Sequence, residues 1–337
     1  MSAERDASVL SRMGLGLWTV RSMAQWPRHA VGGFSELVDD ALLAEELGFH
    51  SIWSAEHRMW YDGWCPSPLL ALAHVAGATR RLRLGTAVLL ASQHDPISLA
   101  RTAATLDRVS GGRLDLGIGL GHRDVEFDAL GLRRDRRGRM MDRALELMPR
   151  VWGGEYGDAP PIQAPGPALW MGGMAPRVLE RAVAGNYNLL LPQTLSAGRI
   201  GALIEDIRAR GWSATAGVMR DLWIEDDPAR VEEMRRRLER GFTEEAGWWV
   251  LQGHPAFDAP ELLARQLHRV SDAALIGSAD DVAAGLRALL EAGVGFLCLR
   301  INIDIADHAE LREQMHRVAG QLPPRLAGAL VTSGARG

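Results

Sequence analysis

Short apolar runs rich in β-branched residues alternate with longer amphipathic segments along most of this chain of 337 residues. Each such pair is typical of a buried strand followed by the helix that covers it, the repeating unit of a parallel sheet. Eight of these units follow one another, and no break marks the start of a second domain. The sequence therefore predicts an α/β fold in which a single (β/α)8 barrel, a TIM barrel, spans residues 1–337, in preference to a doubly wound sheet.

Gly and Pro residues and polar helix caps set the boundaries of the predicted elements. After the seventh strand, residues 225–276 hold two helices around a Gly-Trp-Trp segment, and we interpret them as an insertion. Ser278 is expected to cap the next helix, with Asp281 at its third position. Residues 153–167 form a Pro- and Gly-rich segment, which is either a connection between elements or a tolerated surface insertion. The predicted strands are 14–20, 49–55, 82–90, 113–120, 168–172, 187–191, 215–224 and 294–301, and the other helices are 34–47, 67–79, 96–110, 134–152, one from Pro176, 196–210, 278–293 and 308–320.

Composition excludes several functional classes. The net charge of -4 at pH 7 argues against a nucleic-acid-binding face, and no apolar run is long enough to cross a bilayer. Residues 1–12 lack the apolar stretch of a secretory signal, and the 2 cysteines are too few for a disulfide framework, so we expect a cytoplasmic protein. Every basic residue is Arg, which excludes a Schiff-base lysine and a P-loop lysine.

Barrel enzymes carry their active sites at the C-terminal ends of the strands, so the residues there are the candidates for catalysis and binding. Glu56 and His57 follow the second strand and precede Trp60, Tyr61 and Trp64. A carboxylate and an imidazole beside aromatic side chains can provide a general acid or base in a pocket with little water. The alternative is a structural carboxylate–imidazole pair at the barrel rim.

Two glycine-rich segments follow later strands. Gly117, Gly119 and Gly121 lack the spacing and the βαβ context of a dinucleotide fingerprint. They allow either a flat ligand or a neighbouring part of the barrel to come close to the strand. After the fifth strand, Gly172 and Gly173 lead through Met174, Ala175 and Pro176 to Arg177 at a helix start, where free N–H groups, the helix dipole and a guanidinium suit a phosphate. Glycine before a helix also occurs for geometric reasons alone.

His94 and Asp95 follow the third strand and form a possible second polar pair. Because Asp before Pro commonly starts a turn or a helix, we favour that role here. The histidines lack the spacing of known metal-ligand sets, so no metal site is expected.

Six segments, in this order and spacing, resemble the bacterial luciferase-like family of flavin-dependent oxidoreductases. Each segment alone is weak evidence for the family, but the series extends across nearly the whole chain. The segments are Leu43–Phe49 with Glu56-His57, Arg83–Val88, Leu106–Leu114, Glu126–Gly131, Ile276–Val282 and Glu291–Val294.

The resemblance implies a TIM barrel that holds reduced FMN, or the deazaflavin F420, with its ring system at the C-terminal mouth. It implies a non-proline cis peptide at Ala87-Val88 and a catalytic histidine at His57, although Arg58 stands where the family often has a second histidine. It further implies a mobile lid at the insertion and a homodimer. The cofactor-binding residues that we predict are Ala87, Val88, Gly119, Gly172, Gly173, Met174 and Arg177.

An oxygenating enzyme of this kind must keep water away from its reactive cofactor, and a mouth rich in tryptophan under a closable lid would do so. The alternative is that these tryptophans are simply buried. Trp248 and Trp249 could instead form a dimer contact. The candidate substrate-lining residues are Trp18, Trp60, Trp64, Trp248 and Trp249.

Three functions are compatible with these residues. The first is a monooxygenase that takes reduced FMN from a separate flavin reductase and uses O2 on a small organic substrate, with His57 as acid or base and Glu56 beside it. The second is an F420-dependent reductase or dehydrogenase that transfers a hydride on the same fold. The third is a flavin-binding barrel without catalysis, against which the intact Glu56-His57 pair argues.

Overall fold

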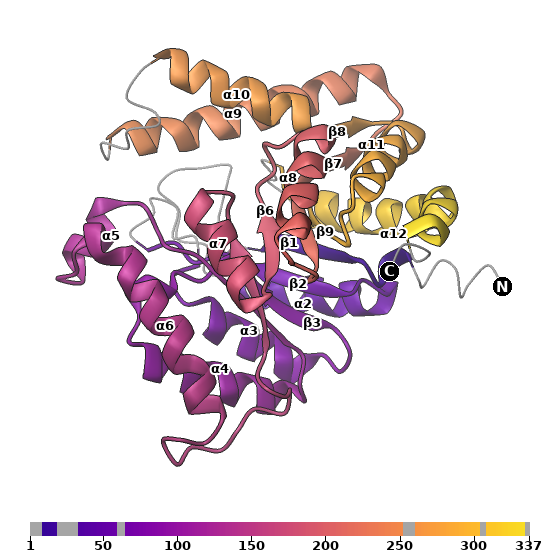
Figure 1. The fold of residues 1–337 in the computed structure, drawn as a ribbon. Helices are drawn as coiled ribbons and strands as arrows, with labels where there is room; N and C mark the ends of the chain where they lie inside the picture. The colour runs from indigo at the N-terminus through magenta and orange to yellow at the C-terminus, as the bar shows by residue number, and fades with distance from the viewer. Residues whose placement is uncertain (1–8, 19–32, 59–64, 252–259, 304–307, 334–337) are drawn as a thin grey trace.

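The computed structural model describes residues 9–18, 33–58, 65–251, 260–303 and 308–333. Eight parallel strands close into a barrel, because β6 pairs both with β5 and with β7. The predicted TIM barrel is therefore confirmed (Figure 1). In ring order the strands are β1 (Met13–Trp18), β2 (Ser51–Ser54), β3 (Arg83–Thr86), β4 (Leu114–Ile118), β5 (Ala168–Gly172), β6 (Asn188–Leu191), β7 (Ala216–Ile224) and β9 (Phe296–Arg300).

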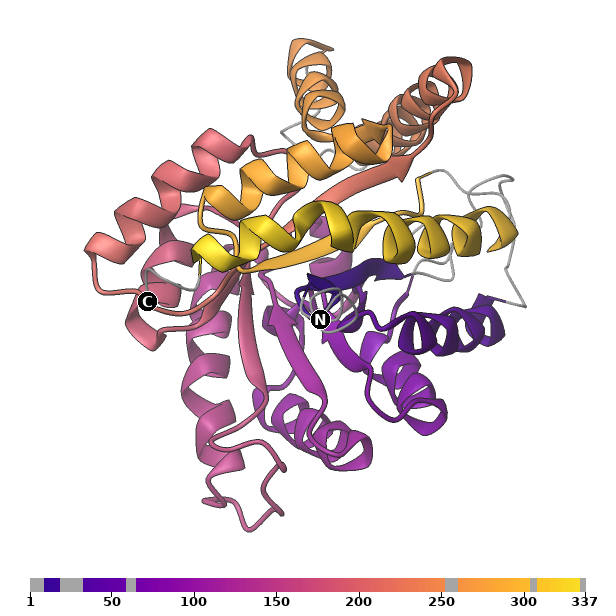
Figure 2. The same cartoon turned by 90° about the vertical axis from the view of Figure 1, so that its right-hand side faces the viewer.

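A layer of helices surrounds the strands (Figure 2). Ser278 and Asp281 form the expected capping box at the start of α11, and Asp95 caps α4 by accepting from the Ser98 N–H at 2.8 Å. The helix-start role favoured for Asp95 is thus confirmed. The helices are α2 (Gly33–Leu47), α3 (Pro68–Ala78), α4 (Pro96–Ser110), α5 (Asp124–Ala129), α6 (Arg137–Trp152), α7 (Pro176–Gly185), α8 (Ala197–Ala209), α11 (Ala279–Glu291) and α12 (His308–Ser333), with short 3-10 turns η1 (Ala91–Gln93) and η2 (Arg134–Arg136).

The insertion after β7 contains α9 (Pro228–Leu251) and α10 (Pro260–Ala273), which lie side by side beyond one end of the barrel (Figure 1). It also ends in a strand that the sequence did not predict, β8 (Leu275–Gly277), which pairs with β7 outside the ring. Three residues are too short to show a period of their own. The insertion packs against the end of the barrel in a second apolar cluster, formed by Trp223, Met234, Leu238, Val270, Ala274, Ile276 and Ile303.

Two further differences from the expected elements have a physical cause. The last helix was expected to end near Gly320, but α12 continues through Pro323 and Pro324 to Ser333. Leu322 and Leu326 on this stretch are fully buried, so tertiary packing outweighs the hydrogen bonds that the prolines remove. The short helix α5 lies where no helix was predicted. Among the helices that the structure describes, none is long and apolar enough to cross a membrane.

Aromatic side chains fill the lower barrel interior. Trp53, Trp170 and Phe296 pack with ring centroids 5.4 to 5.5 Å apart. Glycines on other strands make room for them, since a Cβ on Gly85, the register partner of Trp53, would overlap the Trp53 ring and one on Gly217 would lie 2.9 Å from Trp170. Any ligand site must therefore lie above this layer, at the C-terminal mouth.

Candidate active site at the C-terminal mouth

The ends of β2 and β3 are joined just beyond their ladder. The N–H of Ala87 donates to Ser54 O at 2.8 Å, and the N–H of Glu56 donates to Val88 O at 3.1 Å. The peptide bond between Ala87 and Val88 is cis, as the resemblance implied. The catalytic candidates and this part of the rim are therefore held against each other by backbone hydrogen bonds.

Val88 occupies a notch between the next two strands. A Cβ on Gly119 would lie 2.5 Å from Val88 Cγ2, and a Cβ on Gly172 would lie 2.5 Å from Val88 Cγ1. Both glycines therefore admit a neighbouring side chain of the barrel, which is the packing alternative raised for the glycine-rich segment. Together these three residues form a continuous rim over β3, β4 and β5. Their contact with a cofactor stays a prediction.

Glu56 faces the helix layer rather than the barrel axis. Trp53 points inward, whereas the contacts of the Glu56 carboxylate with Leu90 and His94 direct it toward the helix layer. That His57 faces the mouth stays a prediction. The Glu56 carboxylate is 0% exposed and accepts from the Leu90 N–H at 2.7 Å and from His94 Nε2 at 2.9 Å. It also pairs with Arg58. Glu56 thus fixes the chain around His57 and after the cis peptide, while a direct catalytic role for it stays a prediction.

The same carboxylate belongs to a larger set of charged and polar side chains, which we call the outer network: Glu56, Arg58, Gln93, His94, Arg123 and Glu126. Arg58 Nη1 donates to Gln93 Oε1 at 2.6 Å, and the Arg58 N–H donates to Glu126 Oε1 at 3.2 Å. Arg123 Nη1 donates to Glu126 Oε1 at 3.0 Å and to Arg58 O at 2.7 Å. Burial raises the pKa of Glu126 and lowers that of Arg123, while their mutual contact opposes both shifts.

The outer network borders a cavity of about 280 Å³ between the starts of α3 and α4. Its polar lining includes Glu56, Arg58 and His94, and its apolar lining includes Leu69 and Leu99. Sequence reasoning noticed Arg58 and His94 but did not connect them with Glu56. The contact between positions 56 and 94 spans 38 residues, and no local pattern reports a contact of that kind.

The start of α7 has the features of an anion site. No side chain of the described residues caps this helix, and Pro176 occupies its first turn. Gly173 has φ of +116°, and the nearest atom to a Cβ placed there is Val178 Cγ2 at 3.8 Å, so the backbone is open on this side. The Gly173 N–H donates to Leu190 O at 3.1 Å, which leaves the following turn of backbone to meet a ligand. This cradle fits a phosphate group.

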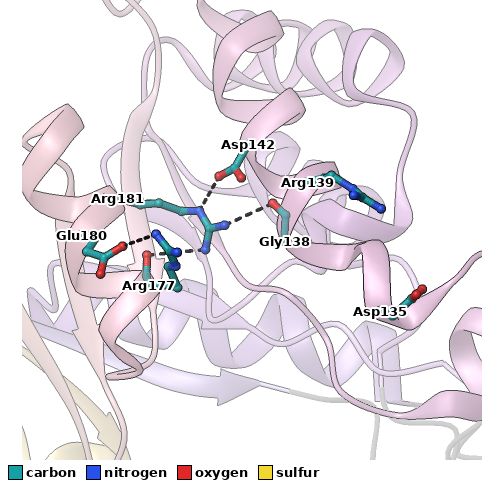
Figure 3. A pocket seen from close by; sticks show the side chains of 7 residues that line it. All are labelled: Asp135, Gly138, Arg139, Asp142, Arg177, Glu180 and Arg181. Carbon is teal, nitrogen blue, oxygen red and sulfur yellow. Dashed lines mark hydrogen bonds and ion pairs between the residues drawn. The ribbon is translucent and has the colours of Figure 1, made fainter.

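Arg177 lies on the outer face of α7. Its side chain is 81% exposed and donates to Glu180 Oε2 at 2.8 Å. Figure 3 shows it in a polar groove of about 640 Å³ between α6 and α7, beside Arg181, which bonds Asp142 and the Gly138 carbonyl. A contact of Arg177 with a phosphate at Gly173 would require it to leave Glu180, so this role stays a prediction.

The tryptophan candidates cannot be placed around the mouth. Trp60 and Trp64 lie outside the described residues. Trp18 ends β1, and Trp248 and Trp249 lie in α9, but the described structure does not extend to their side chains. Their lining role stays a prediction.

A pair that sequence reasoning missed lies on the inner wall of the mouth: Asp221 on β7 and Arg300 on β9. The two positions are register partners, and Arg300 Nε lies 3.2 Å from Asp221 Oδ1. Burial raises the pKa of Asp221, and the charges of Arg300 and Arg220 offset part of that rise. Both residues lie near the ends of predicted strands, so the strand-end rule, applied to strands seven and eight, would have found them.

Comparisons with known proteins bear on the family and on the fold. A family model described as luciferase-like monooxygenase matches residues 13–295. The chain is 30% identical over 171 residues to the oxygenase component of flavin-dependent trigonelline monooxygenase from Acinetobacter baylyi, a match that covers 46% of this chain and 48% of that protein. It is 27% identical over 355 residues to 4-hydroxyprotoasukamycin monooxygenase from Streptomyces nodosus subsp. asukaensis, covering 94% of this chain and 89% of that one.

Two further similarities bear on the fold and on the cofactor. F420-dependent glucose-6-phosphate dehydrogenase from Kineococcus radiotolerans is 38% identical over 128 residues, covering 36% of this chain and 37% of that protein. The oxygenating constituent of 3,6-diketocamphane monooxygenase from Pseudomonas putida, solved with FMN, superposes with a TM-score of 0.73 at 20% identity, covering 93% of this chain and 98% of that one. The first relatives are matched over about half of their own length. Because the family model matches well over half of the chain, the protein belongs to the luciferase-like monooxygenase family.

Proposed function

We propose that this protein is the oxygenating component of a two-component flavin-dependent monooxygenase. It would receive reduced FMN from a separate flavin reductase and use O2 to oxygenate a small organic substrate. Two of the sequence relatives are monooxygenases by name, and one of these two is named as flavin-dependent. Bound flavin would supply the oxygen chemistry, and the protein would supply binding, orientation and proton transfer.

One observation carries the proposal: the uncapped start of α7 and the open Gly173 lie directly after β5, next to the rim formed by Val88, Gly119 and Gly172. The backbone of Gly173 and Met174 would hold the phosphate, and the rim would support the ring system. His57 would donate or accept a proton at the mouth, and its position would depend on Glu56 behind it. The insertion with α9 and α10 would exclude water by closing over the mouth.

The test is an anaerobic titration of the purified protein with reduced FMN and, separately, with reduced F420, followed by admission of O2 in a stopped-flow instrument. We expect tight binding of reduced FMN and an oxygen-dependent transient in flavin absorbance. His57→Ala should keep FMN binding but alter the transient, whereas His74→Ala, an exposed histidine on α3, should change neither. An unchanged transient in His57→Ala would remove the acid–base role from this residue.

The F420-dependent alternative is favoured by the similarity to the F420-dependent dehydrogenase. It would be chosen if reduced F420 binds and no oxygen-dependent transient follows. Binding of neither cofactor would refute both proposals, and FMN binding without any reaction would leave the non-catalytic flavin-binding barrel.

Assembly and location belong to the same proposal. We infer a homodimer in the cytoplasm, with one barrel domain in each subunit and residues 225–276 as its lid. Light scattering that shows a monomer at micromolar concentration would contradict the dimer.

A further inference from the structure

The charged pair on the inner wall of the mouth has no role in the proposed function so far. The strand register shows that both side chains face the barrel interior. A Cβ on Gly14 would lie 2.7 Å from Phe296 Cζ, and a Cβ on Gly16 would overlap Cys298 Sγ, so Phe296 and Cys298 point inward. Arg300 is two residues further along the same strand and therefore points inward as well.

The pair forms the boundary between the packed interior and the mouth. Below it lie the fully buried Cys298 and the aromatic layer that contains Phe296. Burial raises the pKa of Cys298 to about 12, so the thiol is neutral and the layer beneath the pair carries no charge. The Asp221 side chain is 3% exposed and the Arg300 side chain 18%, so of the two it is the guanidinium that reaches the mouth.

The guanidinium of Arg300 is only partly used by its partner. Arg300 Nε is within 3.2 Å of Asp221 Oδ1, yet its N–H is not directed at that oxygen and has no hydrogen-bond acceptor among the residues that the structure describes. Asp221 is the one ion-pair partner of Arg300 within the same part of the chain. Since a guanidinium has five N–H donors in a planar fork, most of its capacity is open to a ligand.

The ring order of the strands indicates which ligand this is. β9 lies directly across the ring from β4, which carries the rim that supports the proposed ring system. The phosphate cradle at α7 follows β5, three strands away from β9. A cofactor that lies on the β3–β5 rim would thus leave the space between itself and Arg300 for the substrate.

We propose that Arg300 determines substrate specificity by binding a carboxylate of the substrate at the inner wall of the mouth, with Asp221 positioning its guanidinium. This inference rests on the proposed function, because it places the substrate between Arg300 and a bound flavin. A carboxylate matches the fork of the guanidinium with two parallel hydrogen bonds, and the low exposure of the site strengthens such a contact.

The experiment compares two probes of nearly equal shape and different charge, benzoate and benzamide. Calorimetry measures the binding of each probe to the protein, with and without FMN. In the wild-type protein benzoate should bind at least about tenfold more tightly than benzamide, a preference that corresponds to about 1.4 kcal/mol. Arg300→Gln should remove the preference, and Arg300→Lys should retain part of it. The control Arg143→Gln, which alters an exposed ion pair on α6, should keep the full preference.

Asp221→Asn separates recognition from a merely structural pair. Asn keeps an acceptor oxygen that can position the guanidinium but lacks the negative charge that competes with the ligand. Asp221→Asn should therefore keep or raise benzoate affinity if Arg300 binds the carboxylate, whereas both Asp221→Asn and Arg300→Gln lower it if the pair only holds the barrel together. Circular dichroism and melting temperature establish that each variant is folded, and Arg300→Lys serves as the readout if Arg300→Gln is not.

Several outcomes would overturn the inference. Equal binding of the two probes, no binding of either, or an unchanged preference in Arg300→Gln each contradict it. If Arg300→Gln weakens reduced FMN and leaves benzoate unaffected, the guanidinium serves the cofactor and the inference is wrong. Benzoate discrimination in a protein that binds no flavin would instead refute the proposed function and leave the carboxylate site standing.

Discussion

The outer network and the inner pair of Asp221 and Arg300 lie at the same end of the barrel, yet they differ in how their polar groups are used. In the outer network Arg58 and Arg123 each donate to more than one acceptor, and the Glu56 carboxylate has three partners. In the inner pair a single contact joins the two residues within the described structure, and a buried N–H of Arg300 has no acceptor there.

This difference separates a scaffold from a binding surface. A buried charge whose hydrogen bonds are all made inside the protein is costly to disturb and has nothing left for a ligand. A buried charge with unpaired donors lowers the stability of the free protein. That stability is recovered when a ligand accepts the hydrogen bonds. Substitutions in the outer network should therefore act on folding, and substitutions in the inner pair should act mainly on ligands.

The largest effect is expected at Glu126. Glu126→Ala leaves the Arg123 side chain, 2% exposed, without its carboxylate and should lower the free energy of unfolding by about 3–5 kcal/mol. Urea denaturation measures the loss. Asp135→Ala, which removes an exposed pair with Arg133, should cause no measurable change. Equal losses of unfolding free energy in Glu126→Ala and Asp135→Ala would contradict the structural role of the outer network.

An intermediate effect is expected at Arg220, the neighbour of Asp221 that points to the helix layer. Its Nη1 donates to Gln193 O at 2.8 Å and to Ala273 O at 2.9 Å, and its Nη2 donates to Leu195 O at 2.8 Å. Burial lowers the pKa of Arg220 to about 10. Arg220→Met should cost about 2–3 kcal/mol, because these carbonyls lose a charged donor.

Hydrogen exchange would sharpen this second prediction. Since the Ala273 carbonyl ends α10, exchange in Arg220→Met should accelerate in α10 and in the segment that contains Gln193, with little change in α4. Acceleration spread evenly over the barrel would show that Arg220 supports the whole fold rather than the attachment of the insertion.

The smallest effect is a pH dependence at Asp221. Burial raises its folded-state pKa above the ordinary value of 3.8. The stability contributed by this group is therefore fully present below the unfolded pKa and lost as pH rises through the folded pKa. Asn cannot ionise, so the melting temperature of Asp221→Asn relative to that of the wild-type protein should rise between pH 4 and pH 8. If the melting temperature of Asp221→Asn falls relative to that of the wild-type protein as the pH rises, the pKa of Asp221 is not raised.

Much of the fold could be predicted because local sequence identifies each βα unit, through strand composition and helix caps such as Ser278 with Asp281. The missed elements depend on distant contacts: β8 needs β7 as its partner, and α12 continues past Pro323 because Leu326 is buried against the rest of the protein. The same limit applies to the site. The sequence pointed to Glu56 and His57 by their place after a strand, but could not show that Glu56 holds His94.

The pairing of β8 with β7 also bears on how this protein could be changed. The N–H of Glu225 donates to the Gly277 carbonyl at 2.9 Å, so the first and last residues of the insertion are neighbours. A segment whose ends already meet can be shortened, lengthened or replaced at a small entropic cost, because closing the loop adds little that the barrel does not already impose. The helices between these ends thus form an exchangeable module, in whose place a different segment could be grafted onto the same barrel.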